Sequence, residues 1–551
     1  MYLRKHQAET SEIADGIVAE SGIKNIVADV VPGGGKSLLP VILASKLIPA
    51  GLSSKIAWIC PRMSLQDQGE RVFLDHRFRH HLNHNLTIRS STNQADPCRG
   101  LQGFTSTYQA LAVDRDKTVL RDFERFPYIL ALDEWHHLAE NGEWTAPIQE
   151  LYDRAAFRLL LTGTLSRGDK GKIAFVPYVA ADENEFRPCF EESDNTAVIT
   201  YGRKEALAER AIIPLEFHFA DGMAEWKKES GKVVRANLST GRADANQALF
   251  TALKTEYAEE LLAAGVDHWK NHTRTVNGNG SLMVVAANIE TAKEYTEQLR
   301  RMGCHAEIAT SDDTPQAMKH IHALKAGKLK ILCAVAMVSE GLDVPSISHI
   351  IYLTNVRTGE WIEQTISRAV RIDPQAGPYS SQKGHIFAPA DRMFCELAAR
   401  INADQCEAVA KEKAVPMAGK GNGNGNGGRP DITPLSSHML HGGQADLFGY
   451  TPGQHMAMVP GGAAELAYEK TQREIETEVR QEIDEHVRAY SRTYGFKPVI
   501  LNSIIKELFG KARENLMVGE LERLKSHLAA NYPVPQRREP DVVLTPLGRW
   551  R

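Results

Sequence analysis

The chain has 551 residues, of which 42% are hydrophobic and 24% are charged, and its formal net charge is -4. This length predicts two or three domains, and the composition excludes the collagen-like, disordered and disulfide-dense classes of protein. The seven cysteines lack C-x-x-C spacing, so they suggest neither a zinc site nor a disulfide framework, and the polar N-terminus and the absence of a long apolar run predict a cytoplasmic chain outside the membrane.

Two series of strand-like runs alternate with helical stretches along the chain. This alternation is typical of βαβ units around a parallel sheet, so we expect an α/β protein with two tandem lobes, at 1–220 and 221–405. The runs of the first lobe are IVADVV, KIAWIC, YILALDE and FRLLLTGT, and those of the second are SLMVVAA, CHAEIAT, KILCAV, SHIIYLT and HIFAPA.

A glycine-rich loop follows the first predicted strand and opens a predicted helix. Its glycines would turn backbone N–H groups towards a polyphosphate, the lysine would neutralise the β and γ phosphates, and the serine hydroxyl suits Mg²⁺. The strict form of such a loop has glycine where this chain has Val30, so a glycine turn that only caps a helix stays open as an alternative. The loop residues are Gly33, Gly34, Gly35, Lys36 and Ser37.

An acidic pair, Asp133 and Glu134, ends the apolar run at 128–132 and is followed closely by His136. Ligands gather at the carboxyl ends of strands in open α/β sheets. Asp133 would hold Mg²⁺, Glu134 would orient and deprotonate an attacking water, and His136 would report the nucleotide state to its neighbours. Such a pair is also common as plain surface charge, but chance explains it poorly beside the glycine loop.

Two arginines of the second series, Arg368 and Arg371, are three residues apart. On a helix both would project from one face and reach a phosphate presented by the opposite lobe. The geometry is that of an arginine finger, although a salt-bridged surface helix would show the same spacing.

These motifs together resemble those of superfamily-two helicases. The glycine loop, DEWH and the TGT at 162–164 resemble motifs I, II and III of the DExH branch, and VSEGLDVP at 338–345 and QTISRAVR at 364–371 resemble motifs V and VI. The stretch YGRKEALAERAIIP at 201–214 resembles the inter-lobe entry of type III restriction translocases and related repair helicases. The resemblance covers residues 1 to about 405 and implies two RecA-like lobes, ATP and Mg²⁺ as cofactors, and a DNA or RNA partner.

The resemblance also assigns further site residues. An early glutamine of the L-R-x-x-Q type would recognise adenine, and hydroxyl and arginine side chains after three strands would grip the phosphates of a nucleic-acid strand. In motif VI the family has glycine where this chain has Ser367, which leaves the arginine roles less certain. The residues so assigned are Gln7, Gly341, Asp343 and Gln364 at the nucleotide, and Arg62, Ser64, Thr107, Thr162 and Thr164 at the nucleic acid.

The tail of the chain is predicted to be a flexible linker and a small helical module. The run GKGNGNGNGGRP has almost no side chain to bury, so we expect a linker over 406–462. Apolar residues at helical spacing then predict helices in a module over 463–551. They are Ile475, Val479, Ile483 and Val487 in one stripe, and Met517, Leu521, Leu524 and Leu528 in the other.

The function that this pattern implies is an ATP-dependent helicase or translocase acting on DNA rather than RNA. One alternative is the duplex-translocating subunit of a restriction or defence complex, with a nuclease or replication/defence protein as its partner. The other is a nucleotide-gated scaffold that does not hydrolyse, for which Val30 and Ser367 would be the signs.

Overall fold

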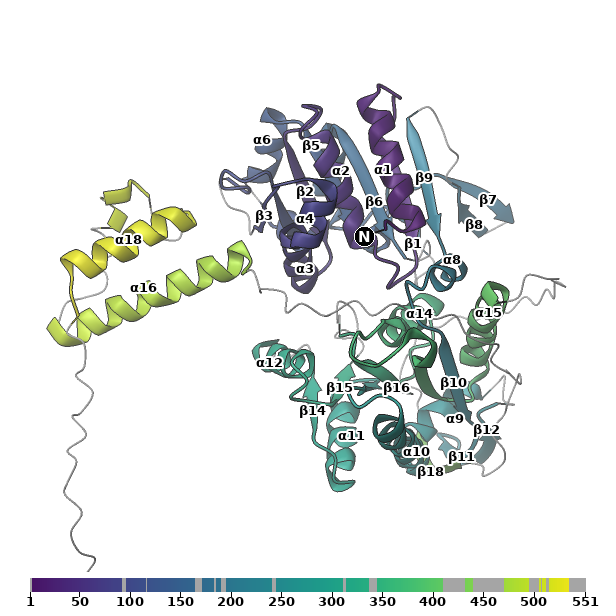
Figure 1. Ribbon diagram of the computed structural model, residues 1–551. Coiled ribbons are helices and arrows are strands. Elements are labelled where there is room, and N and C mark those ends of the chain that lie inside the picture. The colour runs from purple at the N-terminus through teal and green to yellow at the C-terminus, as the bar shows by residue number, and fades with distance from the viewer. Residues whose placement is uncertain are drawn as a thin grey trace, which may run out of the picture.

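Two α/β lobes and a pair of C-terminal helices make up the structure (Figure 1). In the part of the chain described by this computed structural model, no helix is both long enough and apolar enough to cross a bilayer. The described residues are 2–91, 96–114, 116–163, 171–182, 185–189, 195–239, 244–310, 314–335, 344–409, 432–439, 470–494, 505–506, 508–511 and 515–534.

The first lobe is built on a seven-stranded parallel sheet in the order β3-β4-β2-β5-β6-β1-β9. Several of its strands are almost wholly buried, as expected where helices cover both faces of a parallel sheet. The strands are β1 (Asn25–Val30), β2 (Lys55–Cys60), β3 (Ile88–Ser90), β4 (Gly103–Thr107), β5 (Tyr128–Asp133), β6 (Phe157–Thr162) and β9 (Thr196–Tyr201).

Alternate side chains of β1 enter two different cores, because Ile26 and Ala28 pack on one face of the sheet and Val27 on the other.

The helices of the first lobe are α1 (Lys5–Val18), α2 (Leu39–Leu47), α3 (Met63–Leu74), α4 (His76–Leu82), α5 (Tyr108–Ala112), α6 (Thr118–Arg125), α7 (Thr145–Arg154) and α8 (Arg203–Ala208). The lobe also has 3-10 turns η1 (Lys36–Leu38) and η2 (Trp135–His137) and a hairpin of β7 (Tyr178–Asp182) and β8 (Glu185–Pro188).

The second lobe has a six-stranded parallel sheet in the order β10-β17-β16-β13-β15-β14, so the predicted fold of two parallel-sheet lobes is confirmed. Its strands are β10 (Leu215–Ala220), β13 (Ser281–Ala286), β14 (Ala306–Ala309), β15 (Ile331–Val335), β16 (Ile347–Leu353) and β17 (Gly384–Pro389). Its helices are α9 (Ala245–Ala252), α10 (Glu256–Thr275), α11 (Ile289–Arg301), α12 (Thr314–Lys325), α14 (Gly359–Ile366) and α15 (Arg392–Val409), with 3-10 turns η3 (Ser367–Val370) and η4 (Tyr379–Ser381).

Two features differ from the domain limits expected from sequence. Strand β10 pairs with β17, so the chain enters the second sheet before residue 220. Strand β18 (Ile432–Met439), inside the expected linker at 406–462, pairs antiparallel with β11 (Gly222–Lys228), which also pairs with β12 (Val233–Asn237). Residues 432–439 are therefore an edge strand hydrogen-bonded to β11, and this part of the segment is not linker.

The helices expected in the tail are present as α16 (Gln472–Tyr494) and α18 (Val518–Asn531). Val479, Ile483 and Val487 of α16 pack against Leu521, Leu524 and Leu528 of α18 in a core of their own. The start of α16 lies against the edge of the first sheet at β3, where the Glu476 carboxylate accepts from Arg89 and Arg99 at 2.9 Å each. These three side chains are 12%, 7% and 8% exposed, so the contact is a buried ion cluster.

Glu476→Gln is expected to release the helical module from the first lobe. The neutral amide would leave Arg89 and Arg99 buried without their counter-charge, and breaking a buried ion pair typically costs about 3 kcal/mol or more. Hydrogen exchange at the start of α16 should therefore become faster. Glu478→Gln is the matched control, because Glu478 pairs with Lys470 at the surface; equal exchange in the two variants would contradict the prediction.

Five histidines gather on one face of the second sheet, beneath α10. They come from three neighbouring strands and one helix, and their rings lie next to one another. Burial, aided by neighbouring rings, lowers the pKa of His385 to about 2, and burial lowers that of His218 to about 4, so both rings are neutral at ordinary pH. The five are His218, His268, His272, His349 and His385.

Candidate nucleotide site

The glycine loop runs from the end of β1 into η1 and α2. Gly33 has φ 86° and Gly35 has φ 93°, a region that residues with a Cβ rarely adopt. A Cβ on Gly34 would come within 2.8 Å of the Val31 carbonyl oxygen, and one on Gly35 within 2.6 Å of the Arg4 guanidinium. The loop therefore needs its glycines. These glycines carry no side chains at the start of a helix, so a phosphate could approach the backbone closely, as a phosphate cradle requires.

Two side chains of the N-terminal segment hold this loop. Gln7 donates through Nε2 to the Gly35 carbonyl oxygen at 3.1 Å, and its Oε1 accepts from the Arg4 backbone N–H at 3.0 Å. Arg4 donates through Nη1 to the Gly34 carbonyl oxygen at 2.5 Å. The structure thus places Gln7 at the loop, and adds Arg4, which sequence reasoning missed although it belongs to the same L-R-x-x-Q segment.

Lys36 lies between the two carboxylates at the end of β5. Its Nζ is 3.4 Å from Asp133 Oδ1 and also pairs with Glu134 Oε1. Burial works against charge on Glu134, but Lys36 and His136 outweigh it and lower the pKa of this carboxyl to about 2. Burial, together with the Glu134 charge, raises the pKa of Asp133 despite Lys36. Glu134 itself adopts φ 48°, an uncommon backbone conformation that aims its carboxylate at the loop lysine.

Asp29 is a further acidic group at the site that sequence reasoning missed. It stands near the end of β1, paired in register with Thr162, in an otherwise apolar run, and that break in the pattern was the available signal. Burial, opposed by Lys36 and aided by Glu134, raises the pKa of its carboxyl from 3.8 to about 6. The site therefore holds three carboxyls around one lysine.

Asp29→Asn is expected to stabilise the first lobe above pH 6 and to change little near pH 3. The folded pKa of Asp29 lies above the unfolded one, so the folded chain resists losing this proton, and the contribution of Asp29 to wild-type stability falls as pH rises from about 4 to 6. The amide has no such proton to lose. Urea unfolding at a series of pH values measures this, and a gap between the two proteins that does not grow over that range would contradict it.

Ser37 follows Lys36, and its Oγ accepts from Gln68 Nε2 of α3 at 3.2 Å. The loop thus combines a bare backbone cradle, an ammonium, a hydroxyl and carboxylates. These groups fit a magnesium-bound nucleoside triphosphate, since Mg²⁺ takes oxygen ligands and the phosphates take N–H and ammonium donors.

A chain of hydrogen bonds joins the two lobes at His136. Its Nδ1 is 2.9 Å from Thr162 Oγ1, and its Nε2 is 3.2 Å from the amide nitrogen of Gln364 on α14. Thr162 is fully buried, so the structure places it under His136 rather than at a surface where a strand would bind.

The segment after α14 carries the two arginines. A Cβ on Gly33 would lie 3.2 Å from Val370 Cγ2 and 4.0 Å from Arg371 Nε, so Arg371 reaches the glycine loop from the second lobe. The two arginines do not share one helix face, because α14 ends at Ile366; Arg368 lies in the 3-10 turn η3 and Arg371 in extended backbone after it. Ser367 Oγ donates back to the Gln364 carbonyl oxygen at 2.6 Å, a bond that competes with helix continuation.

Arg62 and Thr107 lie at the same edge of the first sheet, after two paired strands. Cys60 of β2 pairs with Thr107 of β4, and both Arg62 and Thr107 stand at helix N-caps, where Thr107 Oγ1 accepts from the Ala110 N–H at 3.1 Å. The remaining predicted residues, Thr164, Gly341 and Asp343, and the side chain of Ser64, lie outside the described residues.

Two family models match the chain. Residues 1–167 match the res subunit of the type III restriction enzyme, and residues 260–373 match the helicase conserved C-terminal domain. An uncharacterized protein of Mycobacterium tuberculosis is 28% identical over 382 residues, which are 69% of this chain and 60% of that protein. UvrABC system protein B of Clostridium botulinum is 28% identical over 111 residues, 19% of this chain and 17% of that protein. The chain spans less than two thirds of the length of these curated relatives.

Solved structures with a similar arrangement share little sequence with the chain. A fragment of a putative HsdR subunit of a type I restriction enzyme from Vibrio vulnificus has a TM-score of 0.46 at 14% identity and covers 71% of this chain and 65% of that one. Dbp5 of S. cerevisiae bound to RNA and ADP BeF3 has a TM-score of 0.42 at 14% identity and covers 72% of this chain and 87% of that one.

Proposed function

Because the chain belongs to the superfamily-two helicases, a family that uses ATP and Mg²⁺, we propose that it hydrolyses ATP between its lobes and moves along a nucleic-acid strand, DNA rather than RNA. The single observation that supports this most is the meeting of Arg371 from the second lobe with the glycine loop of the first, beside the His136–Gln364 bond. Groups that must act on one phosphate thus come from both lobes, so catalysis depends on how the lobes are placed.

The chain's own residues divide the chemistry among them. The loop glycines and Lys36 bind and neutralise phosphate, while Ser37 and Asp133 would hold Mg²⁺, which would polarise the phosphates. Glu134, held ionised, accepts the proton of the attacking water. Arg371 stabilises the negative charge on the transferring phosphoryl oxygens, and Gln7, which the resemblance assigns to the base, holds the loop through the Gly35 carbonyl oxygen.

Coupling to movement follows from the ion pair that occupies the loop. Lys36 is held by Glu134 and Asp133, so phosphate has to take over the lysine before Glu134 is released to act on water. His136 Nδ1 lies 3.6 Å from Glu134 Oε2, and His136 Nε2 is hydrogen-bonded to Gln364 of the second lobe. A movement of the Glu134 carboxylate would therefore be transmitted through His136 to the second lobe. Each cycle of closure and opening would then move the grip along the strand.

The nucleic acid would lie at the carboxyl ends of β2 and β4, beside the partly exposed Arg62, while Thr107, only 8% exposed, caps α5 there. Contacts to phosphates are independent of sequence and weaken as salt rises. The match to the res subunit of a restriction enzyme favours DNA. It also favours the second candidate, a subunit that translocates duplex for a restriction or defence complex, with a nuclease on another chain.

Phosphate release by the full chain, with single-stranded DNA, duplex DNA and RNA in turn, tests the proposal. We expect stimulation by DNA that falls steeply with salt, and its absence in Glu134→Gln. Strand displacement with duplex stimulation separates a helicase from a duplex translocase, which would hydrolyse ATP without parting strands. Nucleotide binding with no phosphate release under any of these conditions would replace the motor with the non-hydrolysing scaffold.

A further inference from the structure

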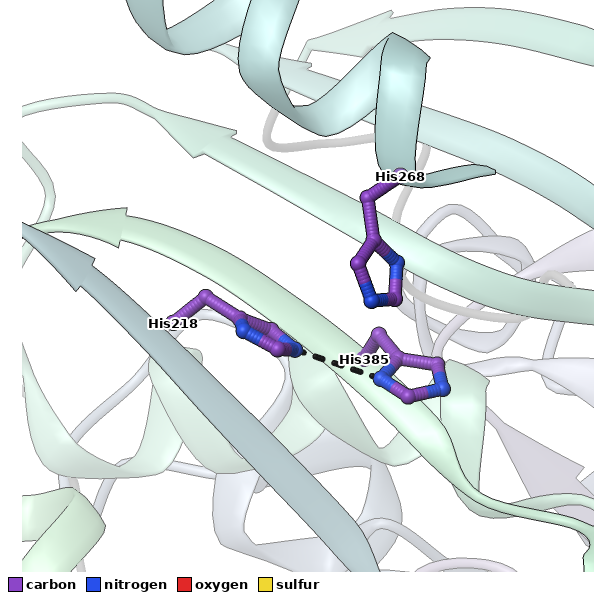
Figure 2. A group of neighbouring side chains, drawn as sticks. All are labelled: His218, His268 and His385. Carbon is purple, nitrogen blue, oxygen red and sulfur yellow. Dashed lines mark hydrogen bonds between the residues drawn. The ribbon is translucent and has the colours of Figure 1, made fainter. Parts of the chain in front are cut away.

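A second cluster of side chains stands apart from the nucleotide site, on the second sheet. His218 on β10 and His385 on β17 come from adjacent parallel strands, and His268 reaches them from α10 (Figure 2). In the register Glu216 pairs with His385, and residues 216 and 218 point to the same face. Helix α10 sits close to this face, since a Cβ on Gly265 would come within 2.5 Å of Ile351 Cδ1.

We propose that His218, His268 and His385 bind a divalent transition-metal ion of the zinc class. One ligand nitrogen from each ring lies within 4.8 Å of the other two. His218 Nε2 and His385 Nδ1 are already 3.2 Å apart, close to the roughly 3.3 Å that separates two nitrogens bound to zinc at 2.0–2.1 Å in a tetrahedral site. His268, at a partly exposed position of α10, supplies the third nitrogen.

Neighbouring groups complete the site and orient its rings. Glu216 Oε1 is 3.7 Å from His218 Nε2 and is the fourth ligand, while its other oxygen pairs with Lys383 at 3.1 Å. His268 Nδ1 is hydrogen-bonded to His349 Nε2 at 2.9 Å, and His349 Nδ1 to Ser348 Oγ at 2.9 Å. His268 thus keeps Nε2 for the ion, and an outer partner fixes its ring, as is usual for metal-bound histidine.

The donor set selects the class of ion. Imidazole nitrogens suit Zn²⁺, Cu²⁺ and Ni²⁺, whereas Ca²⁺ and Mg²⁺ take oxygen ligands, and a three-nitrogen, one-carboxylate site favours tetrahedral Zn²⁺. His272 lies beside His385 and His349 but is not one of the three ligands, and its Nδ1 is buried with no hydrogen-bond partner in the described part of the chain.

An ion here would join the edge strand β10 to β17 and α10. His272, next to these three histidines, lines a cavity together with Ser348 and Arg371. Metal binding at these histidines is measured without nucleotide and is therefore independent of the proposed function.

The test uses the full chain with any histidine tag removed, stripped with a chelator and free of nucleotide, titrated with Co²⁺ and then Zn²⁺. We expect one equivalent of Co²⁺ with the intense visible absorption of a tetrahedral site, displaced by Zn²⁺. His218→Ala and His268→Ala should each lose it. His305→Ala, which removes an exposed histidine, and Asp133→Asn, which alters the nucleotide site, should keep it.

A variant at a surface carboxylate separates loss of the metal site from loss of the fold. Glu216→Gln leaves the buried rings intact and should weaken Co²⁺ binding about tenfold or more. The melting temperature of the wild type should rise with Zn²⁺, and that of His218→Ala should not. The inference is overturned if the wild type binds no stoichiometric ion, or if His218→Ala and His268→Ala bind as much as His305→Ala does.

Discussion

Replacing Lys36 by alanine is expected to lower nucleic-acid-stimulated phosphate release by about a hundredfold or more, the usual loss when one preorganised charge donor leaves an active site. The ammonium is buried between Asp133 and Glu134, which raise its pKa against the cost of burial, so it stays charged. Its removal leaves phosphate facing the two carboxylates that the ammonium now neutralises. Steady-state phosphate release with saturating DNA measures the effect.

Lys46→Ala is the matched control, since Lys46 lies in the last turn of α2 and pairs with the exposed Asp15 at 2.5 Å. It should retain wild-type activity. Because Lys36→Ala also leaves a buried acidic pair without its cation, a thermal melt must show that the variant is folded, and Lys36→Gln, which keeps the side-chain length and a donor, provides a second reading. Activity in both Lys36 variants near that of Lys46→Ala would show that this loop does not hold the phosphates.

The lobes were predictable because their strands are apolar runs long enough to be recognised singly. Runs such as 128–133 and 281–286 are wholly buried, and burial on both faces leaves an unbroken apolar signature. The small sheet was not predictable, because β11 pairs with β18 across more of the chain than any local pattern spans. The sheet to which β10 belongs was missed for the same reason: pairing partners are a tertiary property.

In the nucleotide site, too, the residues in local sequence patterns were predictable and the contacts between distant segments were not. Lys36 and the pair Asp133–Glu134 sit in local contexts, a strand followed by a loop, that the chemistry itself requires. The contact of Arg371 with Gly33 exists only once two lobes meet. Helix α14 ends at Ile366, before either arginine, and no local pattern in the sequence marks that end. The histidine cluster is more remote still, since only the i, i+4 spacing of His268 and His272 on one helix hinted at it.

Arg371→Ala is expected to lower phosphate release by about a thousandfold or more while nucleotide still binds. Arg371 approaches the loop from the second lobe, so its charge acts on phosphoryl oxygens when the lobes are closed, and it adds little to the grip of the loop itself. A loss confined to the chemical step is what distinguishes an arginine finger from a binding residue. Single-turnover phosphate release and titration with a fluorescent ATP analogue measure the two steps separately.

Arg392→Ala is the control for this variant, because Arg392 lies in the same lobe and pairs with Glu396 at the surface. It should leave both measurements unchanged. The cavity beside Arg371 is shared with His272 and Asp373, so a melt of the second lobe must exclude a packing defect. If Arg371→Ala lost affinity and turnover in equal measure, the arginine would be a ground-state ligand of the phosphates, and closure of the lobes would no longer explain how hydrolysis is switched on.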